Sequence, residues 1–151
     1  MDLNEFKIFV TENRKWFHGV NPETEEQLSS YEEQLGFMLP KSLKWLLSCY
    51  GYTRSCGVDN LKESIQKTIE LRKSIKLPND IVILNDWGDA GLIFSMAKDT
   101  RDSEYEIIWA NTADLYNLIE GKPLPREADH FENYSAWVLK RHDDEKEESQ
   151  Y

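Results

Sequence analysis

The residues best suited to recognition chemistry are carboxylates in the segment that joins two apolar runs. Asp86 and Asp89 flank Trp87 and Gly88, so a turn there would display two carboxylates and a large aromatic ring together. Trp is enriched at binding hot spots, and loops on a rigid scaffold often carry recognition. The pattern therefore predicts an interface anchor. The alternative is that Trp87 packs into the core and Gly88-Asp89 only forms the turn, as these residue types commonly do.

A second acidic segment lies further along the chain. Asp99, Asp102 and Glu104, with Glu106 just after them, could bind a cation or a basic surface. The spacing lacks the alternating carboxylates and the distal Glu of a calcium-binding loop, and Arg101 adds a positive charge, so we expect no metal here. A basic protein surface fits better, because complementary charge speeds association and excludes wrong partners. A merely solvated loop is the alternative.

The usual sequence signs of catalysis are missing. The chain has no G-x-S-x-G, no P-loop and no G-x-G-x-x-G. Cys49 is expected to be buried on a patterned helix and Cys56 to be more exposed, both as reduced thiols. Neither belongs to a zinc-binding pattern. His18 and His130 fall at the ends of elements and are expected to be surface or capping groups. The sequence thus predicts no enzyme, no metal and no cofactor.

Composition indicates one folded domain with an acidic surface. The chain has 151 residues, 40% of them hydrophobic, and a formal net charge of -10. This charge argues against nucleic acid, whose binding depends on Lys and Arg, and favours a basic partner or simply solubility. The first residues are acidic where a signal peptide is basic, and no apolar run is long enough to span a membrane. We expect a cytoplasmic protein that does not bind membranes, as a monomer or weak homodimer.

Helices are predicted to make up the first half of the chain. Thr24 and Gln27 form a capping box that opens one helix, although Asn21 before Pro22 offers a competing start. Gly36 closes that helix. By apolar spacing and end signals, helices are expected from Leu3 to near His18-Gly19, from Thr24 to Gly36, from Pro40 to Gly51, and from Asn60 to before Leu77-Pro78.

Strands follow, and then two more helices. The strands are expected at residues 81–84, 91–94 and 105–109, with helices at 113–119 and in a last segment that carries Phe131, Tyr134, Trp137 and Val138. Short connections favour an antiparallel sheet, since parallel neighbours need a long crossover. We therefore predict a single α+β domain over residues 1–142, with helices packed around a central antiparallel sheet. Residues 143–151 are expected to be a solvated acidic tail.

The order of these features resembles the SUKH superfamily. The pattern is a capped helix with an internal Glu, a Leu-Gly, a Leu-Pro and a helix that ends in an aromatic residue and Gly, followed by a middle block and a C-terminal Tyr-x-x-Trp. The residues that carry it are Thr24–Leu28, Glu32, Leu35-Gly36, Leu39-Pro40, Leu43, Leu46-Leu47, Tyr50-Gly51, Gly57–Leu61, Thr68, Leu71-Arg72, Leu77-Pro78, Ile81–Ile83, Gly88-Asp89, Tyr134 and Trp137.

This resemblance implies a non-enzymatic immunity protein that binds a cognate polymorphic toxin and occludes its active site. In one branch of the family the toxin has an N-terminal secretion domain and a nuclease C-terminus, here expected to be an RNase. The alternative is a regulatory scaffold or protein-binding module without a toxin partner, as eukaryotic relatives suggest. The residues expected to contact the partner are Asp86, Trp87, Asp89, Asp99, Asp102 and Glu104.

Overall fold

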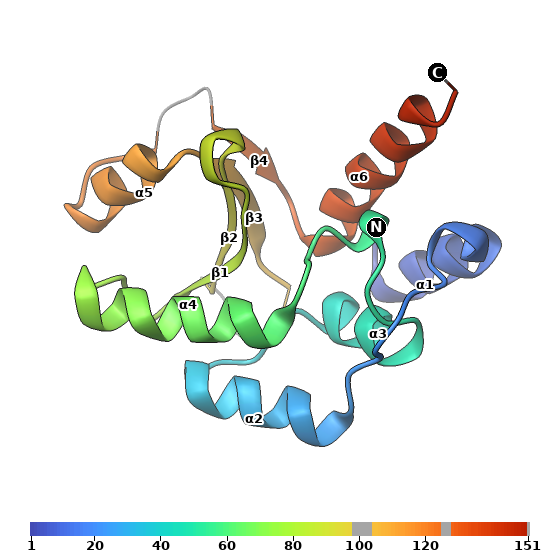
Figure 1. Ribbon diagram of the computed structural model, residues 1–151, viewed down its shortest axis with the longest axis horizontal. Helices are drawn as coiled ribbons and strands as arrows, with labels where there is room; N and C mark the ends of the chain where they lie inside the picture. Colours follow the sequence, from blue (N-terminus) through green and yellow to red (C-terminus); the bar gives the residue numbers. More distant parts are fainter. Residues whose placement is uncertain (98–103, 125–127, 151) are drawn as a thin grey trace.

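The structure, a computed structural model, describes residues 1–97, 104–124 and 128–150. Helices surround a four-stranded antiparallel sheet whose strands follow chain order, β1-β2-β3-β4 (Figure 1). The predicted α+β class is confirmed. The elements are α1 (Leu3–Glu12), η1 (Arg14–Trp16), α2 (Glu25–Leu35), α3 (Lys41–Cys49), η2 (Arg54–Cys56), α4 (Leu61–Ser74), β1 (Ile81–Asp86), η3 (Gly88–Ala90), β2 (Leu92–Met96), β3 (Glu106–Ala110), α5 (Thr112–Ile119), β4 (Asp129–Phe131) and α6 (Tyr134–Glu148).

Both faces of the sheet are buried, which explains why its strands read as continuous apolar runs. Val82 and Leu84 of β1 join the larger core, together with Ile93 and Ile107 of the next two strands. Their alternating neighbours face a smaller core that contains Leu115 of α5. Successive side chains point to opposite faces of a strand, so an uninterrupted apolar run indicates cover on both sides.

The three predicted strands are present, but the sheet has a fourth strand that the sequence did not predict. β3 runs one residue later than expected, and β4 was missed because it has three residues of which only the last is apolar. Phe131, predicted to lie on the last helix, belongs to β4 and pairs with Ile107. The helix begins only at Tyr134, where the side chain of Asn133 accepts a hydrogen bond from the Ala136 N–H at 3.0 Å.

The first helix is shorter than its apolar pattern predicts. α1 ends at Glu12, where Asn13 leaves the helical conformation (φ −113°, ψ 25°). The Asn13 side chain adds a hydrogen bond to the Phe9 carbonyl at 2.9 Å beside that from its backbone N–H at 3.1 Å. The 3-10 turn η1 follows, so the apolar residues up to Phe17 do not continue one helical face. Phe17 nevertheless becomes fully buried. The apolar spacing thus identified the buried residues Phe6, Val10 and Phe17, but it placed the end of the helix several residues too late.

The second helix begins and ends as predicted. Thr24 and Gln27 form the capping box, and Gly36 closes α2 in the left-handed conformation at φ 85°. The competing start is not used, since Asn21 itself has a positive φ of 54°. Glu32, the internal Glu of the motif, accepts hydrogen bonds from the Leu39 N–H (2.6 Å) and the Lys44 ammonium (3.1 Å). It thereby fixes the connection from α2 to α3.

The outer edge of β1 is covered by α4. Thr68 accepts a hydrogen bond from the Ile83 N–H at 3.0 Å, and Ser64 donates to the Leu84 carbonyl at 2.6 Å. The pairing of β1 with β2 is irregular at this point, between Ile83 and Asn85. Exposed edges invite pairing with other chains, and proteins blunt them with bulges or by covering them. The two hydroxyls supply the partners that a further strand would otherwise give.

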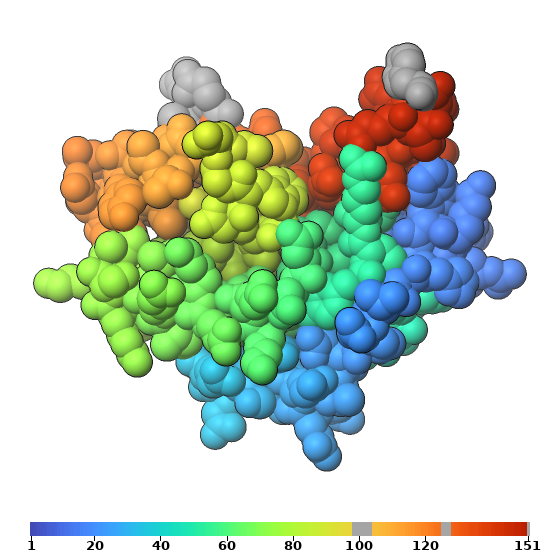
Figure 2. All heavy atoms as spheres, in the orientation of Figure 1, coloured from blue at the N-terminus to red at the C-terminus, as the bar shows by residue number. Residues whose placement is uncertain are grey.

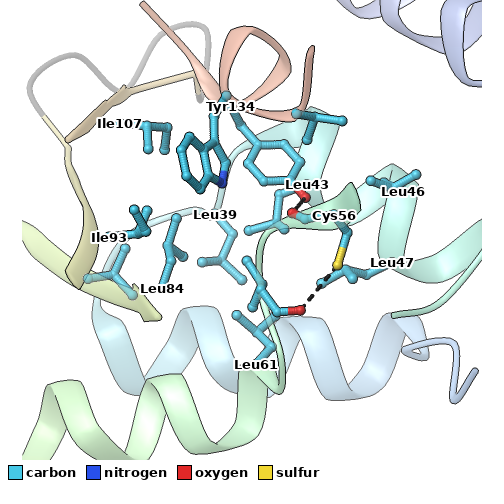
Figure 3. Close-up of a cluster of buried hydrophobic side chains, with 14 of the residues drawn as sticks. Leu39, Leu43, Leu46, Leu47, Cys56, Leu61, Leu84, Ile93, Ile107 and Tyr134 are labelled. Atoms are coloured by element: carbon cyan, nitrogen blue, oxygen red, sulfur yellow. Dashed lines mark hydrogen bonds between the residues drawn. The ribbon is translucent and has the colours of Figure 1, made fainter. Parts of the chain in front are cut away.

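The start of α6 is seated on the segment around η2. Tyr134 is fully buried and donates a hydrogen bond to the Cys56 carbonyl at 2.6 Å (Figure 3). The Cys56 thiol donates in turn to the Val58 carbonyl at 3.1 Å, and burial raises its pKa. Both cysteines are free thiols, but their expected environments are reversed: Cys56 is buried and Cys49 is exposed at the end of α3. Cys56 is buried because its short segment packs beneath α6, whereas Cys49 lies on the side of α3 that faces away from the core.

The acidic segment at the C-terminal end is helical where it is described. α6 continues through Glu148, and its second half is mostly exposed. Asp144 accepts a hydrogen bond from Lys140 at 2.9 Å, an i,i+4 pair. Glu145 and Glu148 reach η2, where they contact Ser55 and Arg54. Carboxylates that sequence composition assigns to a tail therefore extend the helix.

Replacing Gly57 by Ala is predicted to destabilise the protein strongly. A Cβ there would lie 2.2 Å from Trp137 Nε1, and Gly57 has φ +72°. Gly36 is a matched control, with φ +85° and nothing within 4 Å of its added Cβ. Gly36→Ala meets only the left-handed backbone cost of about 1–2 kcal/mol, whereas Gly57→Ala adds about 1–3 kcal/mol of overpacking. Urea unfolding of both variants measures the difference, and equal losses would contradict it.

Candidate functional site

The turn between β1 and β2 is held by its own hydrogen bonds. The Asp86 carboxylate accepts from the Gly88 N–H at 2.9 Å, and the Trp87 N–H donates to the Gly91 carbonyl at 2.9 Å. Gly88 has φ 62° with open space around it, so the chain turns there without crowding. Asp86 and Asp89 are both exposed. The structure thus places these two predicted site residues on one exposed turn. In Figure 2 the segment that contains this turn lies at the surface between the segments of α5 and α6.

Trp87 is partly buried and packs against the larger core. Its ring packs against Trp109 (centroids 5.5 Å apart) and Trp137 (6.1 Å), and the Arg141 guanidinium lies 5.3 Å from its centroid. Trp109 also donates from Nε1 to the Ala90 carbonyl at 2.9 Å. The turn is therefore anchored from β3 and α6. A half-exposed Trp with fixed orientation loses little conformational entropy when a partner covers it.

A surface pocket of about 380 Å³ opens on one side of the turn. Three carboxylates line it: Asp89 from the turn, Asp114 from α5 and Asp129 from β4. Trp109 forms part of its wall. Asp129 reaches this position because β4 pairs it with Trp109. Sequence reasoning missed Asp114 and Asp129, since only the unpredicted strand β4 and the turn into α5 bring them beside Asp89.

A second pocket of about 440 Å³ lies on the other side, between α4 and β1. It is lined mainly by polar side chains, with four carboxylates and one ammonium group: Asp59, Glu63, Glu70, Asp86 and Lys67. The turn therefore separates two concave, negatively charged surfaces. We name the exposed side chains of the turn together with the carboxylates of both pockets the acidic turn surface. Its charge complements a basic partner.

Glu104, the third predicted acidic contact within the described residues, holds a helix instead of facing outward. Its carboxylate accepts hydrogen bonds from the Ser42 N–H at 2.9 Å and the Ser42 hydroxyl at 3.0 Å. α3 has no side-chain cap at Pro40, so Glu104 supplies that cap from a distant part of the chain. Asp99 and Asp102 lie outside the described residues. The four predicted contacts that lie within the described residues, Asp86, Trp87, Asp89 and Glu104, therefore do not form one cluster.

Groups with catalytic or metal-binding potential are dispersed. His130 is exposed and its Nδ1 lies 2.5 Å from the Glu106 carboxylate. Over residues 1–97, 104–124 and 128–150, no three His, Cys, Asp or Glu side chains are grouped so that they could hold a metal ion. Within the same ranges, no helix has the length and apolar character needed to cross a membrane.

The fold and this surface define the class as a small α+β domain with helices around an antiparallel sheet. A family model described as SUKH_5, SMI1-KNR4 cell-wall, matches residues 6–120, and the chain belongs to this family. The match runs from within α1 to the end of α5 and confirms the resemblance that the motifs indicated. No curated protein and no solved structure gives a significant match. The SUKH family is known for immunity proteins and is generally non-catalytic.

Glu104→Ala is predicted to lower the free energy of unfolding by about 1–3 kcal/mol, because the buried Ser42 hydroxyl and the α3 N-terminus both lose their acceptor. Glu26→Ala on the exposed face of α2 is the matched control and should change stability by less than about 0.5 kcal/mol. Chemical denaturation measures both. Unchanged stability of Glu104→Ala would show that this carboxylate does not hold the start of α3.

Proposed function

We propose that this protein is an immunity protein that binds and neutralises a cognate toxin by occluding its active site. It acts by stoichiometric binding and not by catalysis, as a monomer or weak homodimer. The contact surface in this proposal is the acidic turn surface, centred on Asp86, Trp87 and Asp89. Membership of the SUKH family supports the general role. The observation that carries the site is the rigid, half-buried Trp87 between two acidic pockets.

A nuclease, and in particular an RNase, is the proposed toxin class. Enzymes that act on nucleic acid gather Lys and Arg to bind the phosphate backbone. An acidic surface can occupy the same basic groups, and the charge of -10 speeds the encounter with them. Trp87 then supplies the apolar contact that long-range charge cannot. Asp99 and Asp102 remain proposed contacts on the basis of their charge.

The second candidate is a regulatory scaffold that binds a protein other than a toxin. The family description refers to the cell wall, which favours this role for part of the family. Both functions consist of binding a partner protein through a folded surface, so the surface alone does not separate them. The gene next to this one does. A neighbouring toxin gene favours immunity, and its absence favours the scaffold.

Co-expression with the toxin encoded next door is predicted to protect cells. The toxin alone should kill, and an equimolar supply of this protein should restore growth, because occlusion consumes one protein per toxin. Colony counts over a series of expression levels measure the ratio. Protection that saturates far below equimolar would indicate catalysis in place of binding, and equal killing with and without this protein would exclude the immunity role.

Removing the two turn charges is predicted to weaken toxin binding mainly through the association rate. Asp86→Asn with Asp89→Asn keeps an acceptor for the Gly88 N–H and should weaken binding about tenfold at low salt, and less at high salt. Glu26→Gln with Glu33→Gln removes the same charge from α2, which lies at the other end of the molecule from the turn (Figure 1). Association kinetics at two salt concentrations compare the pairs. Equal effects would show that net charge, and not this surface, steers binding.

A further inference from the structure

His142 differs from the other histidines in its surroundings. It is 2% exposed in the second half of α6, whereas His18 and His130 are exposed. Its ring is enclosed by three aromatic side chains: Phe9 of α1 at 5.2 Å, Trp16 of η1 at 5.5 Å and Phe17 at 5.8 Å between centroids. Helix α6 is thus seated on α1 and η1 through an imidazole in an aromatic cage. The sequence singled out neither the cage nor His142.

The cage suits a neutral imidazole and not an imidazolium. Neither Nδ1 nor Nε2 has a hydrogen-bond partner among the described residues. A protonated ring carries two N–H donors and a full charge, which are costly to bury without acceptors. Phe17 stacks on the imidazole at an interplanar angle of 15°, and a cation over a ring recovers only part of that cost. Protonation therefore favours states in which His142 reaches water.

Charged groups near the cage do not reverse this preference. On α6 itself, Lys146 opposes a positive charge on His142, while Asp143 and Glu145 favour it. The α1 and η1 side presents aromatic rings, with the Lys15 ammonium 5.6 Å from the Trp16 ring centroid. Burial outweighs the acidic neighbours and lowers the pKa of His142 from its ordinary value of 6.5.

We propose that His142 makes the seating of α6 pH-dependent: proton uptake by its ring releases the second half of the helix from Phe9, Trp16 and Phe17. The neighbouring Arg141 stacks on Trp87, 5.3 Å from the ring centroid, so release also removes one support of the β1–β2 turn. Mild acid therefore loosens the turn together with the helix. The release is a property of the free protein, and only its effect on partner binding rests on the proposed function.

The sign of the effect follows from proton linkage. When α6 is released, His142 titrates near 6.5, and when α6 is seated it titrates lower. Seating is therefore strongest above about pH 6.5 and weakens as the pH falls, until His142 protonates in the seated state as well. One proton is taken up on release. The opening constant should accordingly rise with falling pH, approaching tenfold per pH unit within that window.

Amide hydrogen exchange along α6, corrected for intrinsic exchange rates, tests this on the full chain between about pH 7.5 and 5. The double variant His18→Gln with His130→Gln leaves His142 as the sole histidine and should keep the full pH slope. Adding His142→Phe preserves an aromatic ring and removes the titration, so the slope should vanish. NMR titration of the sole histidine in the double variant should give a midpoint below 6.5.

Two results would overturn the proposal. An unchanged pH slope after His142→Phe would assign the release to carboxylates. A His142 midpoint at or above the ordinary value would show that the cage tolerates the charged ring. The NMR titration decides even if the His142→Phe chain does not fold. Neither measurement involves a toxin, so failure here is distinct from failure of the immunity proposal.

Discussion

The burial of Trp137 is the constraint on which the arrangement of this fold depends. Its ring is fully buried, contacts the rings of Trp87, Trp109 and Phe131, and lies so close to Gly57 that no side chain fits there. One side chain of α6 thereby touches the turn, two strands and the segment around η2. The family match ends at residue 120, yet Gly57, Trp87 and Trp109 inside it are shaped around a ring from outside it. α6 is therefore part of the domain core.

Polar side chains that are buried or partly buried then fix the relative positions of segments that apolar packing does not fix. Glu32 and Glu104 satisfy backbone N–H groups before and at the start of α3, and Thr68 does the same on the edge of β1. Each of these bonds joins segments that apolar packing alone would allow to slide, because dispersion contacts are not directional. An unsatisfied buried N–H costs about 1–3 kcal/mol, so each bond selects one arrangement. Glu32 and Thr68, which carried the family resemblance, are thus residues that hold the scaffold together.

Sequence patterns correctly predicted the features that depend on residues close together in the chain. The capping box at Thr24, the left-handed closure at Gly36 and the hairpin all follow from residues within a few positions of each other. The errors concern long-range partners. β4 exists because three residues pair with β3, and Glu104 caps α3 across 62 positions of sequence. A single sequence holds no signal for such long-range pairings. An acidic side chain is therefore predicted to be solvent-exposed, even where the fold brings it to a helix terminus that it caps.

The carboxylates of the acidic turn surface differ in what they hold. Asp86 fixes the turn and Asp114 closes a capping box on α5, so replacing either by an apolar residue would affect the fold. Asp89 and Asp129 are exposed, and their side chains make no hydrogen bond within the described part of the chain. Side chains of this second kind can change at little cost in stability. A binding protein built this way can alter its charge pattern to suit a new partner while Trp137 and the buried hydrogen bonds keep the turn in place. On the turn itself, Asp86 and Trp87 take part in the fold, whereas Asp89 can change in this way at little cost in stability.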